Sequence, residues 1–165
     1  MAAGELNVAA LYTAHWRQMV RFAVLLVEDV ATAEDVVQDA FVALYRHQHQ
    51  LRSIDAAMGY VRAAVVNGSR SVIRKRQTGR RRLVLAGPEF GAGADYEVLL
   101  AAEHREAVQA LRRLPRRQRE VLVLRYWSGS SEAEIAATLG ISTGSVKSAA
   151  SRGIATLEKR LGGRR

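Results

Sequence analysis

The chain has 165 residues, and its 25 Lys and Arg residues exceed its 16 Asp and Glu residues, giving a formal net charge of +9 and a pI near 10.8. This balance favours a polyanionic partner, and the absence of cysteine excludes a disulfide framework, a thiolate metal site and a thiol redox sensor. No apolar run approaches the roughly 18 residues of a membrane span, and no basic segment followed by an apolar core opens the chain, so we expect a cytoplasmic protein without membrane insertion or a secretory signal.

Helical periodicity dominates the first half of the chain. Only two prolines and few alternating β-branched residues favour an all-α fold. The spacing of apolar residues predicts helices over 7–27, 31–47 and 56–76. The second of these has an apolar stripe at positions 33, 36, 37, 40, 41, 44 and 45, with Thr32 as its predicted N-cap. The predicted core residues of the other two are Trp16, Met19, Phe22, Leu26, Met58, Val61, Val65, Gly68 and Val72.

A glycine-rich stretch follows the third predicted helix. No helical period survives across residues 78–96, which predicts a flexible linker. Beyond it, the pattern predicts four more helices, over about 97–113, 116–127, 131–139 and 143–161. The chain is therefore expected to form two small helical domains, residues 1–77 and 97–165, on either side of the linker.

The sequence SEAEIAATLGISTGSVKSAASRG at 131–153 has the spacing of two helices that cross at a tight turn. Ile135 and Ala136 share one face of the first helix, and the small side chain of Ala136 allows a close crossing. Gly140 can end that helix because glycine adopts positive φ without steric cost, and Ser142 is a good N-cap for the next. This pattern predicts a helix-turn-helix, whose second helix enters the DNA major groove; an ordinary helical hairpin is the alternative.

The second helix of this motif separates apolar from polar side chains. Its predicted buried stripe consists of Val146, Ala149, Ala150, Ile154 and Leu157. The outward side chains that could contact DNA are Ser145, Lys147, Ser148, Ser151 and Arg152. Two arginine-rich blocks, at 70–82 and 112–119, contain no acidic residue. Such blocks are often only solvated faces, but their position beside a DNA-reading motif adds weight to the alternative that they contact phosphates.

Two further stripes in the first half are not explained by a helical core. The outer stripe of the second helix consists of Asp35, Gln38, Asp39, Val42 and Arg46, and is either a solvated face or a docking surface. One sector of the third helix carries Tyr60, Asn67, Arg70 and Arg74. Aromatic, amide and guanidinium groups are those that bind single-stranded nucleic acid, although Tyr60 could instead complete the core and the arginines could simply be solvated.

In this order, the segments resemble a bacterial sigma factor of the extracytoplasmic function (ECF) group, within the sigma-70 family. AEDVVQDAFVALYRH at 33–47 looks like the region 2.2 helix, which in that family docks on the clamp of core RNA polymerase. MGYVRAAVVNGSRSVIRKRQ at 58–77 is similar to the region 2.3 and 2.4 helix, which opens the promoter and holds the −10 element. Residues 111–153 look like region 4, which binds the −35 element, and the ending SVKSAASRGIATLEKRL suggests a small actinobacterial ECF factor.

The resemblance implies roles for the residues at matching positions. It implies that the outer stripe of the second helix, Asp35, Gln38, Asp39, Val42 and Arg46, binds core polymerase. The residues implied to contact the −10 element are Tyr60, Asn67, Arg70, Arg74, Lys75 and Arg76. Those implied to contact the −35 element are Ser145, Lys147, Ser148, Ser151 and Arg152. Ala149 and Ser151 stand where relatives often have Arg and an aromatic residue, which distinguishes this chain's −35 reader.

The resemblance also implies a function and a set of partners. The two domains correspond to σ2 and σ4, and the protein would direct core RNA polymerase to specific promoters by −35 binding and −10 melting. Its expected partners are the clamp and flap of core polymerase and promoter DNA, with an anti-sigma factor as a further candidate. That work is binding, so no catalytic residue, cofactor or metal is expected.

Three other classes of function remain open from the residues alone. A stand-alone regulator shares the helix-turn-helix but gives no role to the stripes at Asp35 and Tyr60. A metalloenzyme is disfavoured because His47 and His49 have no third ligand nearby in the sequence, and no phosphate loop or nucleophile elbow is present. A structural helical adaptor leaves the recognition helix unexplained.

Overall fold

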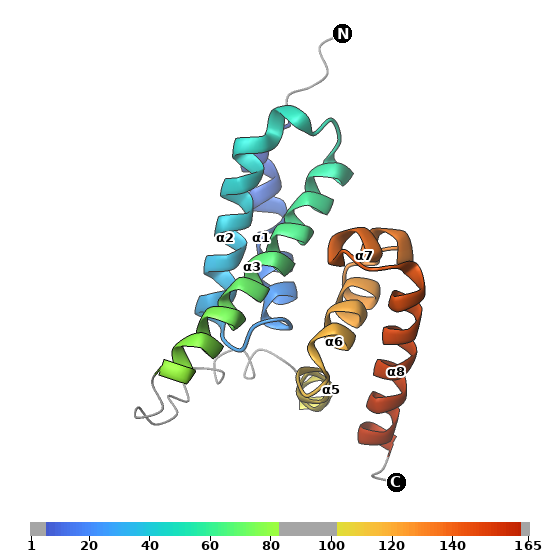
Figure 1. Cartoon of the computed structure of the whole chain (residues 1–165). Helices are drawn as coiled ribbons and strands as arrows, with labels where there is room; N and C mark the ends of the chain where they lie inside the picture. The colour runs from blue at the N-terminus through green and yellow to red at the C-terminus, as the bar shows by residue number, and fades with distance from the viewer. Residues whose placement is uncertain (1–5, 83–101, 163–165) are drawn as a thin grey trace. The chain divides into compact units, whose positions relative to one another are not determined.

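The computed structural model of the chain describes residues 6–82 and 102–162, and all regular structure within those ranges is helical (Figure 1). The described residues divide into two compact units, one containing 6–82 and the other 102–162. The expected all-α fold is confirmed for these ranges. The predicted linker lies, from residue 83 onward, outside the described residues.

Three long helices form the first unit: α1 (Val8–Val24), α2 (Val30–His47) and α3 (Ile54–Arg82), with the 3₁₀ turn η1 (Gln48–Gln50) between α2 and α3. The helix α2 packs against both α1 and α3, and the three lie side by side in Figure 1. Their apolar stripes meet in a core whose fully buried side chains include Met19, Phe22, Val37, Leu44, Val61 and Val65. The predicted core is wrong at Tyr45, which is 64% exposed because it lies at the edge of the α2 stripe.

The start of α2 is fixed by a side-chain cap. The carboxylate of Asp29 accepts hydrogen bonds from the backbone N–H of Thr32 and from its hydroxyl, both at 2.8 Å. The prediction of Thr32 as the N-cap is therefore wrong, and the cap lies three residues earlier. A carboxylate at this position also interacts favourably with the positive end of the helix dipole, which a hydroxyl does not.

The helix α3 continues beyond its predicted end at residue 76. It reaches Arg82, so the boundary expected for the first domain at residue 77 falls inside the helix. A glycine within a helix costs only about 1 kcal/mol relative to Ala, and the arginines that follow Gly79 are good helix formers. The helix thus carries its row of basic residues out past the core.

Four α-helices and a π-helical turn form the second unit: α5 (Ala102–Arg112), α6 (Arg116–Leu122), η2 (Val123–Trp127), α7 (Glu132–Leu139) and α8 (Thr143–Gly162). The helix α8 packs against α5, α6 and α7. The helices α6 and α8 approach each other closely at Gly153, where an added Cβ would lie 2.8 Å from Cδ1 of Leu122. The missing side chain of Gly153 therefore lets the long C-terminal helix lie directly on α6.

The helices α7 and α8 form the predicted helix-turn-helix. Ser131 caps α7 in a capping box with Glu134. Gly140 ends α7 in the left-handed region, at φ 64°, and the hydroxyl of Ser142 accepts a hydrogen bond from the backbone N–H of Ser145 at 3.1 Å. The buried residues that join the two helices are Ile135, Ala136, Leu139, Val146, Ala149 and Ala150. Ile154 and Leu157, also predicted to be buried, are half-buried.

Candidate polymerase and nucleic-acid interfaces

The outer stripe of α2 lies entirely on the surface. Its five members, Asp35, Gln38, Asp39, Val42 and Arg46, are all exposed, and the apolar side chain of Val42, between Asp39 and Arg46 along the stripe, is 43% exposed. The opposite side of α2 is buried against α1 and α3. The stripe can therefore contact a partner without any change in the core of the unit.

An aromatic cluster borders this stripe on the α1 side. The ring of Tyr12 lies 4.8 Å from that of Trp16 and 5.2 Å from that of Phe41, measured between centroids. Phe41 is buried, but Tyr12 and Tyr45 are exposed. Sequence reasoning counted Tyr45 as core, so it missed this exposed aromatic surface beside the predicted docking stripe.

The predicted single-strand-binding residues lie along one helix, α3. Asn67, Arg74 and Lys75 are exposed, while Tyr60 and Arg70 are half-buried. The Tyr60 hydroxyl lies 3.1 Å from Nδ1 of His47, and the two rings lie 5.6 Å apart between centroids. Tyr60 is therefore held against the C-terminal end of α2, and its partner His47 was not found from the sequence.

Arg76 differs from the other basic residues of α3. Its guanidinium Nη2 lies 3.0 Å from Oδ2 of Asp29 and also donates to the hydroxyl of Thr32. Burial alone would raise the pKa of the Asp29 carboxyl, but the hydrogen bonds from Thr32 and Arg76 together with the Arg76 charge outweigh it, so that this pKa lies below its ordinary value of 3.8. The same guanidinium is thus used to hold the N-terminus of α2, and a DNA phosphate would have to compete for it.

The predicted −35 reading residues all lie on the exposed side of α8: Ser145, Lys147, Ser148, Ser151 and Arg152. The first of them is partly engaged, because the Ser145 hydroxyl lies 2.9 Å from that of the cap residue Ser142. Lys147 and Ser148 lie within the first two turns of the helix, which is the part of a recognition helix that reaches base edges. Ser151 and Arg152 lie in the next turn. The helix-turn-helix therefore presents a polar, cationic face while its apolar face is buried.

Three charged side chains meet beside this reading face. Glu132, at the first position of α7, has its carboxylate Oε1 3.5 Å from Nη1 of Arg125 in η2. The other carboxylate oxygen, Oε2, lies 3.7 Å from Nζ of Lys147 in α8. Sequence reasoning found Lys147 but missed both of its neighbours in this cluster, because the fold brings the three residues together from separate elements.

The π-helical turn also exposes aromatic side chains. Tyr126 is 65% exposed and Trp127 is 43% exposed, and the guanidinium carbon of Arg125 lies 5.8 Å from the centroid of the Tyr126 ring. π-helical turns occur frequently at functional sites. In the sequence, this exposed pair belongs to the run VLRYW at 123–127. The first two residues of the run are apolar and buried, and the two aromatic residues come after Arg125.

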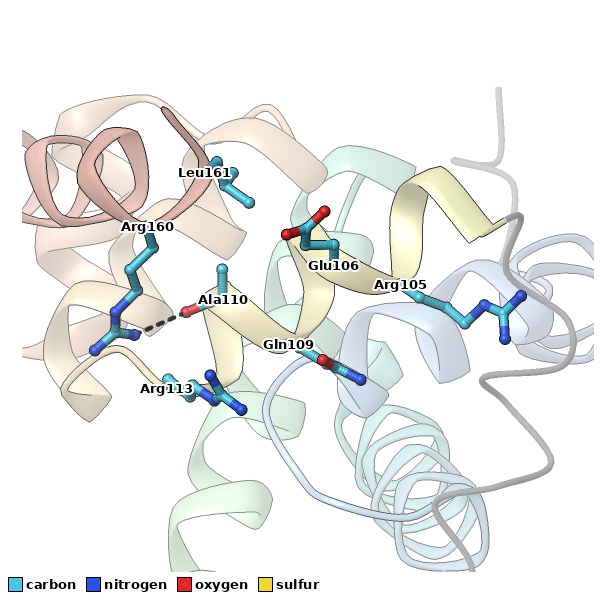
Figure 2. Close-up of a pocket in the computed structure, with 7 residues that line it drawn as sticks. All are labelled: Arg105, Glu106, Gln109, Ala110, Arg113, Arg160 and Leu161. Atoms are coloured by element: carbon cyan, nitrogen blue, oxygen red, sulfur yellow. Dashed lines mark hydrogen bonds between the residues drawn. The ribbon is translucent and has the colours of Figure 1, made fainter. Parts of the chain in front are cut away.

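A basic groove of about 620 Å³ lies between α5 and the C-terminal end of α8 (Figure 2). It is lined by Arg105, Glu106, Gln109, Ala110, Arg113, Arg160 and Leu161. Arg160 bridges the two helices by donating a hydrogen bond of 3.3 Å to the carbonyl oxygen of Ala110, which Figure 2 shows as a dashed line. The lining includes three guanidinium groups and one carboxylate, a charge balance that favours an acidic partner over a basic one.

Neither a metal site nor a membrane span is found in the described ranges. Within 6–82 and 102–162, no group of three or more His, Asp or Glu side chains is arranged to hold a metal ion. The helices of these ranges include none that is long and apolar enough to cross a bilayer. His47, considered above as a metal ligand, is instead bonded to Tyr60 and to the Ala43 carbonyl at 2.9 Å.

Two family models match the chain, one in each unit. Residues 11–78 match the family described as Sigma-70 region 2, and residues 104–157 match Sigma-70, region 4. The first match contains the whole outer stripe of α2 and the α3 residues up to Arg76. The second contains the helix-turn-helix and all five predicted reading residues.

Two relatives match along most of this chain. A probable RNA polymerase sigma factor RfaY of Xanthomonas campestris pv. campestris is 28% identical over 165 residues, which cover 92% of this chain and 39% of that protein. The ECF RNA polymerase sigma factor SigL of Mycobacterium tuberculosis is 32% identical over 152 residues, 89% of this chain and 84% of that protein.

A solved structure supports the fold. The sigma factor RpoE of Bartonella quintana, in complex with the anti-sigma factor NepR, superposes with a TM-score of 0.76 at 23% identity, covering 95% of this chain and 98% of that one. That likeness concerns the fold, whereas the two family matches and the SigL relative extend it to function. The chain belongs to the sigma-70 family and, within it, to the ECF RNA polymerase sigma factors, which direct transcription initiation at specific promoters.

Proposed function

We propose that this sigma factor divides its work among three surfaces, each on one helix. The outer stripe of α2 docks on the clamp of core RNA polymerase. The exposed sector of α3 holds the separated −10 strand, and α8 binds the −35 duplex in the major groove. The observation that carries this assignment is that the α2 and α8 sets are fully exposed, as are Asn67, Arg74 and Lys75 of the α3 set, so each surface can bind without disturbing the core.

The α2 stripe suits a protein partner with positive charge. Asp35 and Asp39 supply carboxylates, and Val42, one turn after Asp39, supplies an apolar contact that a purely solvated face would not need. Such a mixed surface, one helix wide, gives a partner both electrostatic steering and apolar area to bury. The Tyr12 and Tyr45 rings extend the same surface toward α1.

The α3 sector suits unstacked bases. Tyr60 offers a ring for stacking, Asn67 an amide that can read a base edge, and Arg74 a charge for the phosphates. Unstacking a base costs a few kcal/mol, and binding in a protein site offsets that cost. Promoter melting on this helix is therefore binding work, and we propose that the chain itself catalyses no reaction.

The basic groove between α5 and α8 is proposed as a second contact with polymerase, at the flap. It lies near Arg160, at the end of α8 away from the reading residues, so a protein held there leaves the DNA face free. Two contacts on polymerase would fix the spacing of the two units, and binding of one unit would raise the effective concentration of the other.

Because the proposed partners are polymerase and chromosomal DNA, we propose that the protein acts in the cytoplasm. An anti-sigma factor is a further candidate partner, as the Bartonella quintana relative is solved with one. Copurification from the native cell, with identification of the bound chains, tests both. Recovery of polymerase subunits supports the function, and a co-eluting partner that displaces them would act as an inhibitor.

Transcription from defined templates tests the proposal as a whole. Core polymerase with the purified chain should initiate at promoters that core alone does not use. A gel shift with the free chain and duplex DNA distinguishes the proposed function from that of a stand-alone regulator. Tight, sequence-specific binding by the free chain, without any stimulation of core polymerase, would contradict the proposed function.

A further inference from the structure

A single carboxylate lies between two cations beside the reading face of the helix-turn-helix. Glu132 contacts Arg125 of η2 at 3.5 Å through one oxygen and Lys147 of α8 at 3.7 Å through the other. The two cations come from different elements, η2 and α8. What they share is an anion placed between them.

Both cations are accessible to solvent and hence to DNA. The side chain of Lys147 is 68% exposed and that of Arg125 is 39% exposed, whereas Glu132 is 33% exposed. A DNA phosphate is also an anion with two free oxygens, and side chains such as these bind it by charge. Glu132 therefore occupies, within the protein, the position between two cations that a backbone phosphate could take.

The contacts are loose enough to be exchanged. Both distances exceed the 2.7–2.9 Å or so of strong charge-assisted hydrogen bonds, and exposed ion pairs of this kind contribute only about 0–1 kcal/mol. They do, however, cancel charge at the reading face. Each phosphate neutralised by a protein cation steepens the dependence of log K on log salt by about 0.9.

We propose that Glu132 is an affinity-limiting residue, whose carboxylate neutralises Arg125 and Lys147 and so weakens phosphate binding by the −35 reader. This rests on the proposed role of α8 in duplex binding. In the free protein the carboxylate keeps non-specific DNA affinity low, so that the reader binds duplex DNA usefully only with polymerase. The effect is on all sequences alike, because both cations act on the DNA backbone by charge and phosphates carry no base identity, whereas the base contact proposed for Lys147 at the promoter can form with or without Glu132.

The variant that tests this is Glu132→Gln, which keeps the size of the side chain and removes its charge. Its matched control is Glu158→Gln, an equal charge change at an exposed position later in the same helix as Lys147. Binding is measured by fluorescence anisotropy for the full chain, alone and as holoenzyme, on promoter and non-promoter duplexes over a range of salt concentrations. Thermal unfolding of each variant checks that the fold is kept.

Glu132→Gln should tighten binding to both duplexes by roughly fivefold at low salt, about the factor that one surface ion pair represents. The salt slope should steepen by about one, with the promoter preference unchanged. When Lys147 is replaced by Ala, the gain in DNA affinity from Glu132→Gln should be less than half of the gain seen with Lys147 present. The control should show no gain at either duplex.

Three results would overturn the inference: an unchanged affinity in Glu132→Gln, an equal gain in Glu158→Gln, or a loss of promoter preference in Glu132→Gln. The last would mean that Glu132 positions Lys147 for base reading. The wild-type holoenzyme in the same series tests the proposed function separately. If it binds the promoter selectively while Glu132→Gln behaves as wild type, only the inference fails.

Discussion

The guanidinium of Arg76, near the C-terminal end of α3, lies 3.0 Å from the carboxylate of Asp29, which caps the N-terminus of α2. The pair joins two helices at the end of the first unit where α3 leaves the core. Asp29 is the less exposed partner, with 16% of its side chain accessible against 42% for Arg76. One carboxylate thus serves both as a helix cap and as the anchor of a basic residue in the predicted −10 helix.

The first prediction concerns the acid stability of this pair. The folded state holds the pKa of Asp29 below 3.8, so the unfolded chain takes up the proton first as pH falls. The stabilisation is complete above about pH 5 and is lost as pH falls through about 4 and below. Asp29→Asn keeps a good N-cap but loses the charge, so it should cost up to about 1 kcal/mol at pH 7 and much less near pH 3.

Thermal unfolding of both proteins across this pH range measures the difference. Glu28→Gln, which removes the neighbouring exposed carboxylate, is the matched control and should show no such trend. A difference between wild type and Asp29→Asn that is constant from pH 7 to pH 3 would mean that the ion pair contributes nothing and that only the cap matters.

The second prediction tests the outer stripe of α2. Reversing both acids, Asp35→Lys with Asp39→Lys, should weaken binding to core polymerase by at least tenfold while leaving the fold intact, since exposed substitutions usually change stability by within about 0.5 kcal/mol. Competition with a labelled sigma factor for core enzyme measures this. Glu28→Lys with Asp55→Lys makes the same charge change at exposed positions outside the stripe. If the stripe variant competes for core enzyme as well as wild type does, the outer stripe of α2 is not the docking surface.

The third prediction separates melting from duplex affinity. Asn67→Ala should reduce open-complex formation on a duplex promoter, because an amide available to a separated base is lost. A template with a pre-melted −10 bubble should recover much of the activity, since Tyr60 and the basic residues of α3 remain. Permanganate footprinting reports the open complex on the duplex template, and transcript yield is compared on both templates. Equal losses on both would assign Asn67 to folding or general affinity.

The helix-turn-helix could be predicted closely because its signals are local. The positive φ of Gly140 and the cap at Ser142 depend on residues within one turn of each other, and both are as expected. The outward placement of Lys147 follows from helical period alone. Its partner Glu132 could not be predicted, because that contact depends on how closely α7 crosses α8.

In the first unit the errors have the same origin. Tyr45 fits the apolar stripe of α2, but a side chain at the stripe's edge is buried only if the neighbouring helix covers it, and α1 does not. The cap of α2 was placed at Thr32 on residue type alone. The structure has Asp29 as the cap, and Asp29 has a further partner in Arg76, which is distant in sequence.

The fourth prediction concerns reading of the −35 element. Lys147→Ala and Ser148→Ala should each relax the preference at one or two base positions, because a good contact to a base edge gives about 1–3 kcal/mol of discrimination. Arg152→Ala should weaken all sequences alike and flatten the salt slope by about one, as expected for a phosphate contact. A −35 substitution library transcribed by holoenzyme tests all three. Unchanged base preference in both Lys147→Ala and Ser148→Ala would contradict the assignment of the reading residues.

The fifth prediction uses two glycines of α8. A Cβ at Gly153 would meet Leu122 at 2.8 Å and Gln118 at 3.4 Å, so Gly153→Ala should destabilise the second unit by about 1–2 kcal/mol despite its better helix propensity. At Gly144 the nearest atom would be 3.8 Å away, so Gly144→Ala should be neutral or stabilising. Chemical denaturation compares them. If Gly153→Ala instead stabilised the second unit, the Leu122 side chain must be able to move aside without a cost in free energy.

The division of α8 into a packed side and a free side has a consequence for evolution and for design. The residues that hold the helix in place, such as Val146 and Ala150, are not those that would face DNA. If α8 reads the −35 element as proposed, substitutions at Ser148 or Ser151 should alter which promoters are recognised while the scaffold stays constant. A collection of such variants, each expressed with its own cognate promoter, would give parallel transcription channels that share one polymerase.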